Sequence, residues 1–187
     1  MEVKLEYITP NALERIGRYA GICYGSSTER DTCIKRAIAC KDKGHLATLR
    51  FASATFHITG ISRVCSHQFV RSKHLDFLQR SQRYCNESNT SFVYPGTDKD
   101  TLISSAYQSA MARYQELIAA GVKKEDARFV LPEGTQTELI VTGNLQAWLD
   151  FIRLRADKHA QWEIRAVAKE INNQLAKECN GLFNWMP

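Results

Sequence analysis

The spacing of apolar residues along the chain predicts a protein built mainly from helices. After Thr9-Pro10, which suits the start of a helix, apolar residues recur at helical spacing up to Tyr24-Gly25. A second helix is expected over 29–41, because Gly44 supplies the left-handed position that commonly closes a helix. The same spacing predicts helices over 61–70, 101–120, 123–130, 144–155 and 159–178.

Strands are expected in two places, 49–59 and 135–142, where Thr, Ile and other strand-forming residues roughly alternate. The polar and basic segment 71–84 is expected to form a loop and a short helix, and 86–100 a turn-rich connection. Helices and strands do not alternate regularly. The pattern therefore predicts an α+β fold, helix-rich with a small mixed or antiparallel sheet, in a single domain over 1–187.

The composition excludes several classes of protein. With 44% hydrophobic and 24% charged residues among 187, the chain is neither disordered nor fibrous. No apolar run approaches the roughly 18 residues of a membrane helix, and the charged N-terminus does not resemble a signal peptide, so a cytoplasmic protein without a membrane partner is expected. The net charge of +5, without long basic runs, does not predict nucleic-acid binding. It fits recognition of a small phosphorylated ligand by a few arginines.

Common motifs for metals, cofactors and nucleophiles are missing from the sequence. The six cysteines form no CxxC pair, so no metal site is expected and reduced thiols are favoured over disulfides. There is no GxGxxG, P-loop or GxSxG motif. Cys65 and Cys85 flank the basic segment and could be proposed as nucleophiles, but a structural role is favoured.

The first candidate site is the basic segment 71–84 with the residues just before it. Arg71 and Arg83 lie twelve residues apart, with further cations between them. Such a segment can be a solvated basic loop. Gln68 and Ser81 favour a nucleotide site instead, because guanidinium groups bind phosphate while amides and hydroxyls offer directional bonds to a base.

The second candidate site lies on the C-terminal helices. On a helical wheel, Asn144, Arg155 and His159 fall within roughly 60° of one another, beside an apolar stripe. Arg155 could instead form a structural ion pair, for which the candidate partners are Asp150, Asp157 and Glu163. His159 alone would usually be an ordinary helix histidine. Arg128 could add a further guanidinium.

Several blocks of the sequence together resemble the flavin-dependent thymidylate synthases. The similarity covers about residues 10–180 in order, and the C-terminal block is the most specific. The blocks are Gly44-His45, Phe56-His57-Ile58-Thr59-Gly60-Ile61-Ser62-Arg63, His67-Gln68-Phe69-Val70-Arg71, Ser81-Gln82-Arg83-Tyr84, Ala127-Arg128-Phe129-Val130-Leu131-Pro132 and Leu154-Arg155-Ala156-Asp157-Lys158-His159-Ala160-Gln161-Trp162-Glu163-Ile164.

The resemblance implies that the protein methylates C5 of dUMP with FAD, NADPH and methylenetetrahydrofolate. It also implies the family's α+β fold and a homotetramer whose active sites are shared among subunits. Arg155 would polarise the base and Ser81 would orient the nucleotide. The nucleotide-binding positions of the family match Gln68, Gln79, Ser81, Arg83, Arg128 and Arg155, and its flavin-binding positions match His45, Arg71, Lys73, Asn144 and His159.

The chain departs from the family pattern mainly at flavin-side positions. The family signature RHRxxSxNExSxRY is altered here at Ser72, Lys73, Asp76, Leu78 and Gln79, and its GHxxxxEH block at Arg50 and Phe51. Lysine in place of arginine lacks the planar, two-pronged donor, and leucine in place of asparagine removes hydrogen bonds. Two alternatives therefore stay open: C5 methylation or hydroxymethylation of another pyrimidine nucleotide such as UMP or dCMP, and a non-catalytic nucleotide-binding homologue.

Overall fold

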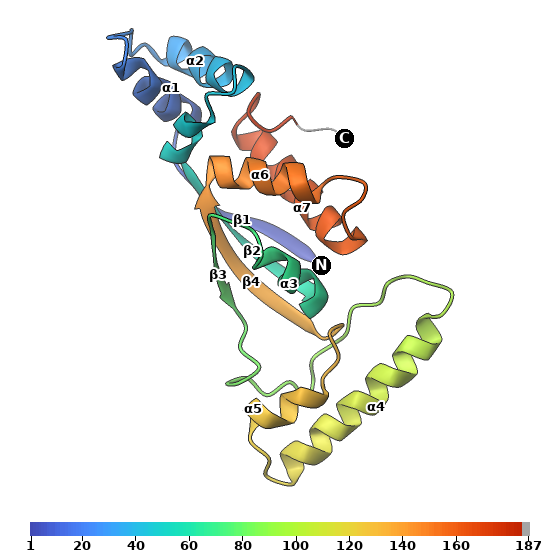
Figure 1. The fold of residues 1–187 in the computed structure, drawn as a ribbon. Helices are drawn as coiled ribbons and strands as arrows, with labels where there is room; N and C mark the ends of the chain where they lie inside the picture. Colours follow the sequence, from blue (N-terminus) through green and yellow to red (C-terminus); the bar gives the residue numbers. More distant parts are fainter. Residues whose placement is uncertain (185–187) are drawn as a thin grey trace.

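A four-stranded antiparallel sheet organises the fold of residues 1–184, which the computed structural model describes (Figure 1). The strands lie in the order β1-β2-β4-β3, so that the two longest strands form the centre. The pairing shifts register between Leu5 and Tyr7 and between Thr59 and Ile61. The strands are β1 (Glu2–Ile8), β2 (Ser53–Ser62), β3 (Leu75–Gln79) and β4 (Gln136–Asn144). The expected α+β class with an antiparallel sheet is confirmed.

The helices divide into three groups around this sheet (Figure 1). The N-terminal pair packs beyond one end of the sheet, the central group covers one face of it, and a lower lobe extends from its other end. The N-terminal pair is α1 (Ala12–Ile22) and α2 (Arg30–Asp42), followed by the 3-10 helix η1 (Leu46–Phe51). The central group is α3 (Arg63–Phe69), α6 (Leu145–Arg155) and α7 (Trp162–Glu178), and the lobe holds α4 (Asp100–Ala119), α5 (Lys124–Ala127) and η2 (Arg128–Val130).

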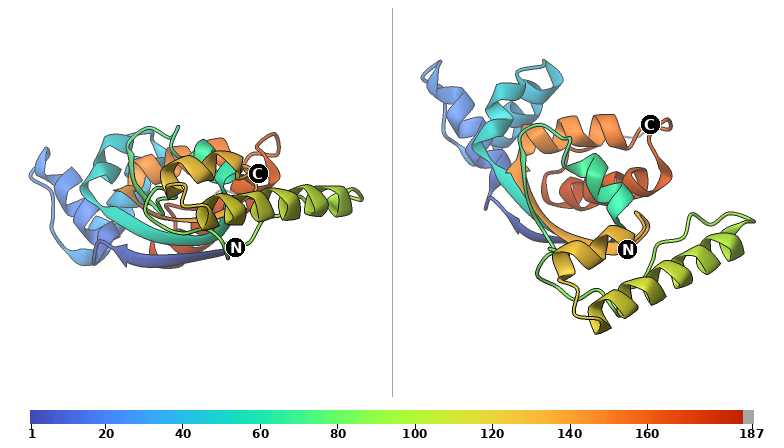
Figure 2. Two further views of the ribbon diagram at one scale, coloured as in Figure 1. Left: turned by 90° about the horizontal axis from the view of Figure 1, so that it is seen from below. Right: turned by 60° about the horizontal axis from the view of Figure 1, so that its bottom comes forward.

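The main core lies between the sheet and the central helices (Figure 2). Alternate residues of β2 and β4 point into it, among them Phe56 and Val141, whereas their neighbours face outward. Trp148 of α6 packs edge-on against Phe56, with ring centroids 5.0 Å apart, and its indole nitrogen donates to the carbonyl of Ala54 at 3.0 Å. Removing either aromatic ring would cost about 3–5 kcal/mol of stability.

Two strands were missed by the sequence pattern. β1 was not expected, because three of its four exposed positions are charged and Val3 is its one buried residue. β3 lies inside the segment expected as a loop and short helix, where Leu75 is buried and Leu78 is 74% exposed. Both are edge strands with one solvated face, so pairing with β2 and β4 outweighs their weak local signals.

Several element boundaries also differ from the expected ones, for reasons of capping. The strand expected from residue 49 begins at Ser53, since 46–51 forms η1. The helix expected from residue 61 begins at Arg63, because Ser62 ends β2 and its hydroxyl accepts from the Cys65 amide at 3.0 Å. The last helix starts at Trp162 rather than 159, because the side chain of Gln161 caps it.

The lower lobe is joined to the sheet through a small polar core. Tyr114 of α4 is fully buried, and its hydroxyl accepts from the Glu87 amide at 3.1 Å. The buried Glu87 carboxylate in turn pairs with Arg80 at 3.2 Å. Phe92 and Tyr107 stack with centroids 4.5 Å apart. These contacts fix the lobe relative to the segment that follows β3.

Candidate functional site

The turn after β3 carries Arg83, a predicted nucleotide-binding residue, and places it near a second one, Arg128, from a distant part of the chain. Arg83 lies in this turn and its Nε is 2.7 Å from the Oε2 of Glu125, at the start of α5. Arg128 follows α5 directly, and its Nε donates to the main-chain carbonyl of the same glutamate at 3.0 Å. The structure therefore brings both Arg83 and Arg128 into contact with Glu125, one at its side chain and the other at its main chain.

A third guanidinium lies near Arg128 that the sequence reasoning did not select. Arg63 opens α3 and is half-buried, and this burial lowers the pKa of its side chain, with the nearby charge of Arg128 acting in the same direction. Its guanidinium forms no ion pair or hydrogen bond with any residue from 1 to 184. A cation in the first turn of a helix opposes the helix dipole, and this was the signal available in the sequence.

Arg155 and Gln68 lie together on the central helices. The Nη2 of Arg155 donates to the main-chain carbonyl of Gln68 at 3.0 Å, at the end of α3. Its Nε is buried and has no hydrogen-bond partner within the described part of the chain. None of the three acids considered as ion-pair partners is paired with Arg155 there, since Glu163 instead accepts from the amide and hydroxyl of Ser62. Leaving a buried donor such as this Nε without a partner costs free energy.

Gln79 and Ser81 are held by contacts within the chain. The side-chain nitrogen of Gln79 donates to Ser66 at 2.9 Å and to Thr137 at 3.3 Å, which links β3 to α3 and β4. The hydroxyl of Ser81 accepts from the Arg83 amide at 3.3 Å. Ser81 therefore shapes the turn that presents Arg83.

The predicted flavin residues do not share one cavity in a single chain. His45 lines a cavity of about 700 Å³ whose walls include the rings of Tyr19, Tyr24 and Phe51. Arg71 and Lys73 are exposed before β3 and form no ion pair with residues 1–184. The other two predicted flavin-binding residues, Asn144 and His159, form hydrogen bonds within the chain.

Asn144 caps the start of α6, and His159 is bonded to Asp157 in the turn that follows this helix. The side-chain oxygen of Asn144 accepts from the Ala147 amide at 2.9 Å and caps the helix. Beyond its other end, the His159 amide and ring both bond to the carboxylate of Asp157. These bonds, the backbone one foremost, lower the pKa of Asp157.

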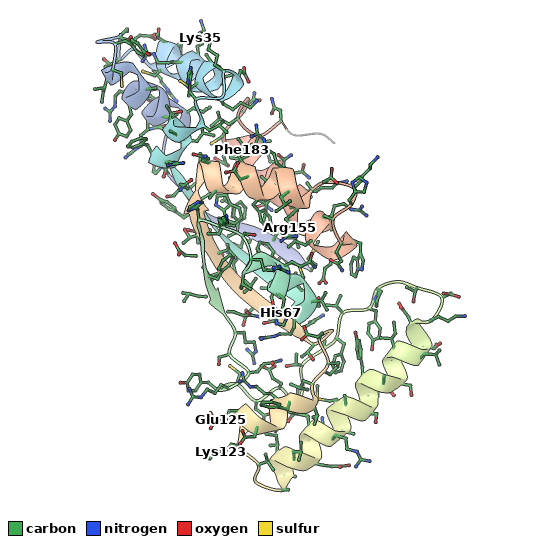
Figure 3. All side chains as sticks on the ribbon, in the orientation of Figure 1. Lys35, His67, Lys123, Glu125, Arg155 and Phe183 are labelled. Carbon is green, nitrogen blue, oxygen red and sulfur yellow. The ribbon has the colours of Figure 1, made fainter. Side chains whose placement is uncertain are left out.

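The predicted residues thus form separate groups on one chain. Figure 3 places Glu125, the contact of Arg83 and Arg128, in the lower lobe, and Arg155 among the central helices, with His67 of α3 between them. The cavity beside His45 is at the far end, near α1. The clamp of guanidinium groups expected from the sequence is assembled only in part by one chain.

Cys65, one of the two cysteines considered as a nucleophile, is fully buried. Burial, and secondarily the charge of Glu163, raises the pKa of the Cys65 thiol well above its usual range, so this thiol is not poised as a nucleophile. Over residues 1–184, no three His, Cys, Asp or Glu side chains gather as a metal site would require. None of the helices in that range is both long and apolar enough to cross a membrane.

Comparison with known proteins assigns the chain to a family. The family model described as "Thymidylate synthase complementing protein" matches residues 4–179. A flavin-dependent thymidylate synthase of Mycobacterium tuberculosis strain H37Rv is 39% identical over 162 residues, which is 76% of this chain and 65% of the relative. Those of Mycobacterium avium strain 104 and Mycobacteroides abscessus are 38% and 39% identical, with 65% and 64% of their lengths covered. The chain spans about two thirds of the length of these relatives, and it belongs to the thymidylate synthase complementing protein family.

Proposed function

We propose that the protein is a flavin-dependent thymidylate synthase that transfers a one-carbon unit to C5 of dUMP and reduces it to the methyl group of dTMP. Methylenetetrahydrofolate would supply the carbon and NADPH the electrons, as the names and chemistry of the relatives suggest. The observation that carries the proposal is the meeting of Arg83 and Arg128 at Glu125 in a chain of this family. Two guanidinium groups at one place suit the phosphate dianion of a mononucleotide.

The phosphate would be held by arginines and the turn that presents them. Arg83 and Arg128 would bind the phosphate oxygens, with Ser81 fixing the turn through the Arg83 amide. Arg63, half-buried and without an ion pair among residues 1–184, would add a third donor. Gln79, tied to Ser66 on the same helix as Gln68, would contact the sugar or base.

Arg155 would polarise the pyrimidine ring. Transfer of a carbon to C5 makes negative charge develop on the carbonyl oxygens of the ring, and a fixed guanidinium stabilises that charge. The carbonyl of Gln68 holds the Nη2 of Arg155, while its buried Nε has no partner within residues 1–184. A pre-oriented donor of this kind lowers the barrier without moving during the reaction.

The chain's donors fit FAD by their chemistry. The aromatic cavity beside His45 suits a flat ring, and the unpaired cations Arg71 and Lys73 suit a diphosphate. Asn144 and His159 would supply further hydrogen bonds. When bound, the flavin supplies the hydride that reduces the transferred carbon. The residues named here would bind and orient the cofactor against the nucleotide.

The proposal includes a cytoplasmic homotetramer of single-domain chains with the family's fold and shared active sites. Its support is that one chain holds the nucleotide and flavin residues in separate groups. Symmetric association would bring a group from one chain against a different group of another. Neither nucleic acid nor a membrane is a partner in this proposal.

The test is a comparison of substrates with product masses. Purified protein is incubated with methylenetetrahydrofolate and NADPH and, separately, with dUMP, UMP or dCMP. We expect that dUMP alone gains the mass of one methyl group. We also expect the purified protein to absorb at about 450 nm because of bound flavin. Methylation of UMP or dCMP, or a hydroxymethyl product, would show a related enzyme instead. Nucleotide binding without flavin or product would show a non-catalytic homologue.

A further inference from the structure

The geometry points to Glu125 as a positioning residue whose carboxylate pre-orients Arg83, beside Arg128, for the phosphate group of the nucleotide. This inference rests on the proposed function, since it assumes a phosphorylated substrate at Arg83 and Arg128. Neither the sequence pattern nor the resemblance selected Glu125. Its role follows from which atoms of the two arginines it contacts.

Glu125 contacts the Nε of each arginine, that of Arg83 through its carboxylate and that of Arg128 through its main-chain carbonyl, and it leaves their outer nitrogens unbonded. Its Oε2 lies 2.7 Å from the Nε of Arg83, and its main-chain carbonyl accepts from the Nε of Arg128 at 3.0 Å. The Nη atoms of both arginines contact no hydrogen-bond partner within residues 1–184. Those Nη atoms are the donors that a phosphate would use.

Two further contacts hold the same arrangement. The guanidinium of Arg83 lies 5.4 Å from the ring centroid of Tyr84. Lys124, next to Glu125, donates from Nζ to the Tyr84 carbonyl at 2.9 Å. The start of α5 is therefore tied to both the backbone and the side chain of the turn. Arg83 is otherwise 58% exposed, so these contacts restrict a side chain that would move freely.

The surface around these residues has the charge that an anion requires. A hollow of about 450 Å³ is lined by Arg83, Tyr84, Lys123, Lys124 and Glu125, together with apolar residues that close the lobe. Figure 3 shows Lys123 and Glu125 together on this side of the lobe. Cations outnumber the single carboxylate, so a phosphate entering the hollow meets a net positive charge.

A carboxylate beside a phosphate site could instead compete with the ligand for Arg83. Competition would be strongest if the carboxylate occupied both Nη atoms in the two-pronged geometry that phosphate also uses. The observed contact is to Nε alone. Glu125 therefore orients the Arg83 guanidinium, although its carboxylate neutralises part of the positive charge there. Because the guanidinium is ordered before the phosphate binds, less side-chain entropy is lost on binding.

The test measures dUMP affinity by calorimetry for the full chain and its variants. We expect Arg83→Ala to weaken binding by at least about tenfold and Glu125→Ala by about three- to tenfold. Glu125→Gln should stay within about twofold of the unchanged protein, because its amide oxygen can still accept from Nε. Glu116→Ala is the matched control, since Glu116 forms a comparable 2.6 Å pair with Arg113 outside the hollow.

The outcomes separate this inference from the proposed function. Tighter dUMP binding by Glu125→Ala would show competition and overturn the positioning role. Unchanged binding by that variant, with Arg83→Ala still weakened, would overturn it as well but leave the phosphate site intact. Unchanged binding by Arg83→Ala would instead overturn the phosphate site. Should Glu125→Ala fail to fold, Glu125→Asp gives the same test, because its shorter side chain cannot reach Nε. Inorganic phosphate as a competitor shows whether the effect acts on the phosphate group.

Discussion

At the scale of single residues, buried polar groups hold the helix that carries Gln68. The Glu163 carboxylate, at the start of α7, accepts from the Ser62 amide at 2.7 Å and from its hydroxyl at 2.5 Å. Ser62 also caps α3, so the first turn of that helix is tied to α7. Arg155 binds the other end of α3 through the Gln68 carbonyl. The position of Arg155 is thus linked to a buried acid that does not contact it.

The six thiols should differ sharply in reactivity. Cys65 is fully buried and its thiol pKa is raised, chiefly by burial, whereas Cys23 is exposed. Because the thiolate is the reactive form, we expect iodoacetamide at pH 8 to alkylate Cys23 and leave Cys65 unmodified in the folded protein. Cys179 is also buried, with a pKa raised to about 12, and should likewise be protected.

Peptide mass mapping after brief labelling checks this expectation. Unfolded protein in denaturant serves as the control, because all six thiols should then react. Rapid labelling of Cys65 under native conditions would contradict the burial seen here and reopen its role as a nucleophile.

At the scale of elements, helices α1 and α2 approach each other closely at Gly17. A side chain on Gly17 would place its Cβ only 1.7 Å from the carbonyl oxygen of Cys33 in α2. The carbonyl of Gly17 also accepts from the Arg36 guanidinium at 2.9 Å. The absence of a side chain at this position allows the two helices to approach.

We expect Gly17→Ala to destabilise the protein by about 1–3 kcal/mol, because backbone atoms must move apart to admit the methyl group. Urea unfolding measures the change. Gly21→Ala is the comparison: its Cβ would meet the Arg36 Nη1 at 2.2 Å, a side-chain atom that can move away by giving up its bond to Gly17, so a smaller loss is expected. Equal stability for Gly17→Ala and the unchanged protein would contradict the observed packing.

The sequence predicted long, strongly periodic helices and strands better than the edge strands of the sheet. The helices over 101–120 and 144–155 and the strand over 135–142 were found nearly at their observed bounds. β1 and β3 were missed because one face of each strand is solvated, so the pairing that forms them comes from residues distant in the chain. Similarly, the sequence could not identify Arg63 and Glu125 as site residues, because the residues near them in the structure are distant in the chain.

At the scale of the whole molecule, the proposed functional residues are spread over separate surfaces. Arg83 lies in the turn after β3 that contacts the lower lobe, Arg155 lies on the central helices, and His45 lines a cavity near the N-terminal pair. The sheet face opposite the central helices is covered by none of the helices described (Figure 2) and exposes Leu78. In the proposed homotetramer, association of chains would bring these separate cationic groups into one site.

A mixing experiment tests whether Arg83 and Arg155 of different chains serve the same site. Arg83→Ala and Arg155→Ala are each expected to abolish most dUMP methylation. When the two variants are co-expressed, random assembly gives sites in which one chain supplies an intact Arg83 and another an intact Arg155. We then expect about a quarter of the activity of the unchanged protein to return. The control is a mixture prepared from separately folded variants under conditions that prevent subunit exchange, which should stay inactive. If co-expression restores nothing although mixed assemblies form, both arginines act from one chain, and the separation of the lobe from the central helices must then be closed by a movement within the molecule.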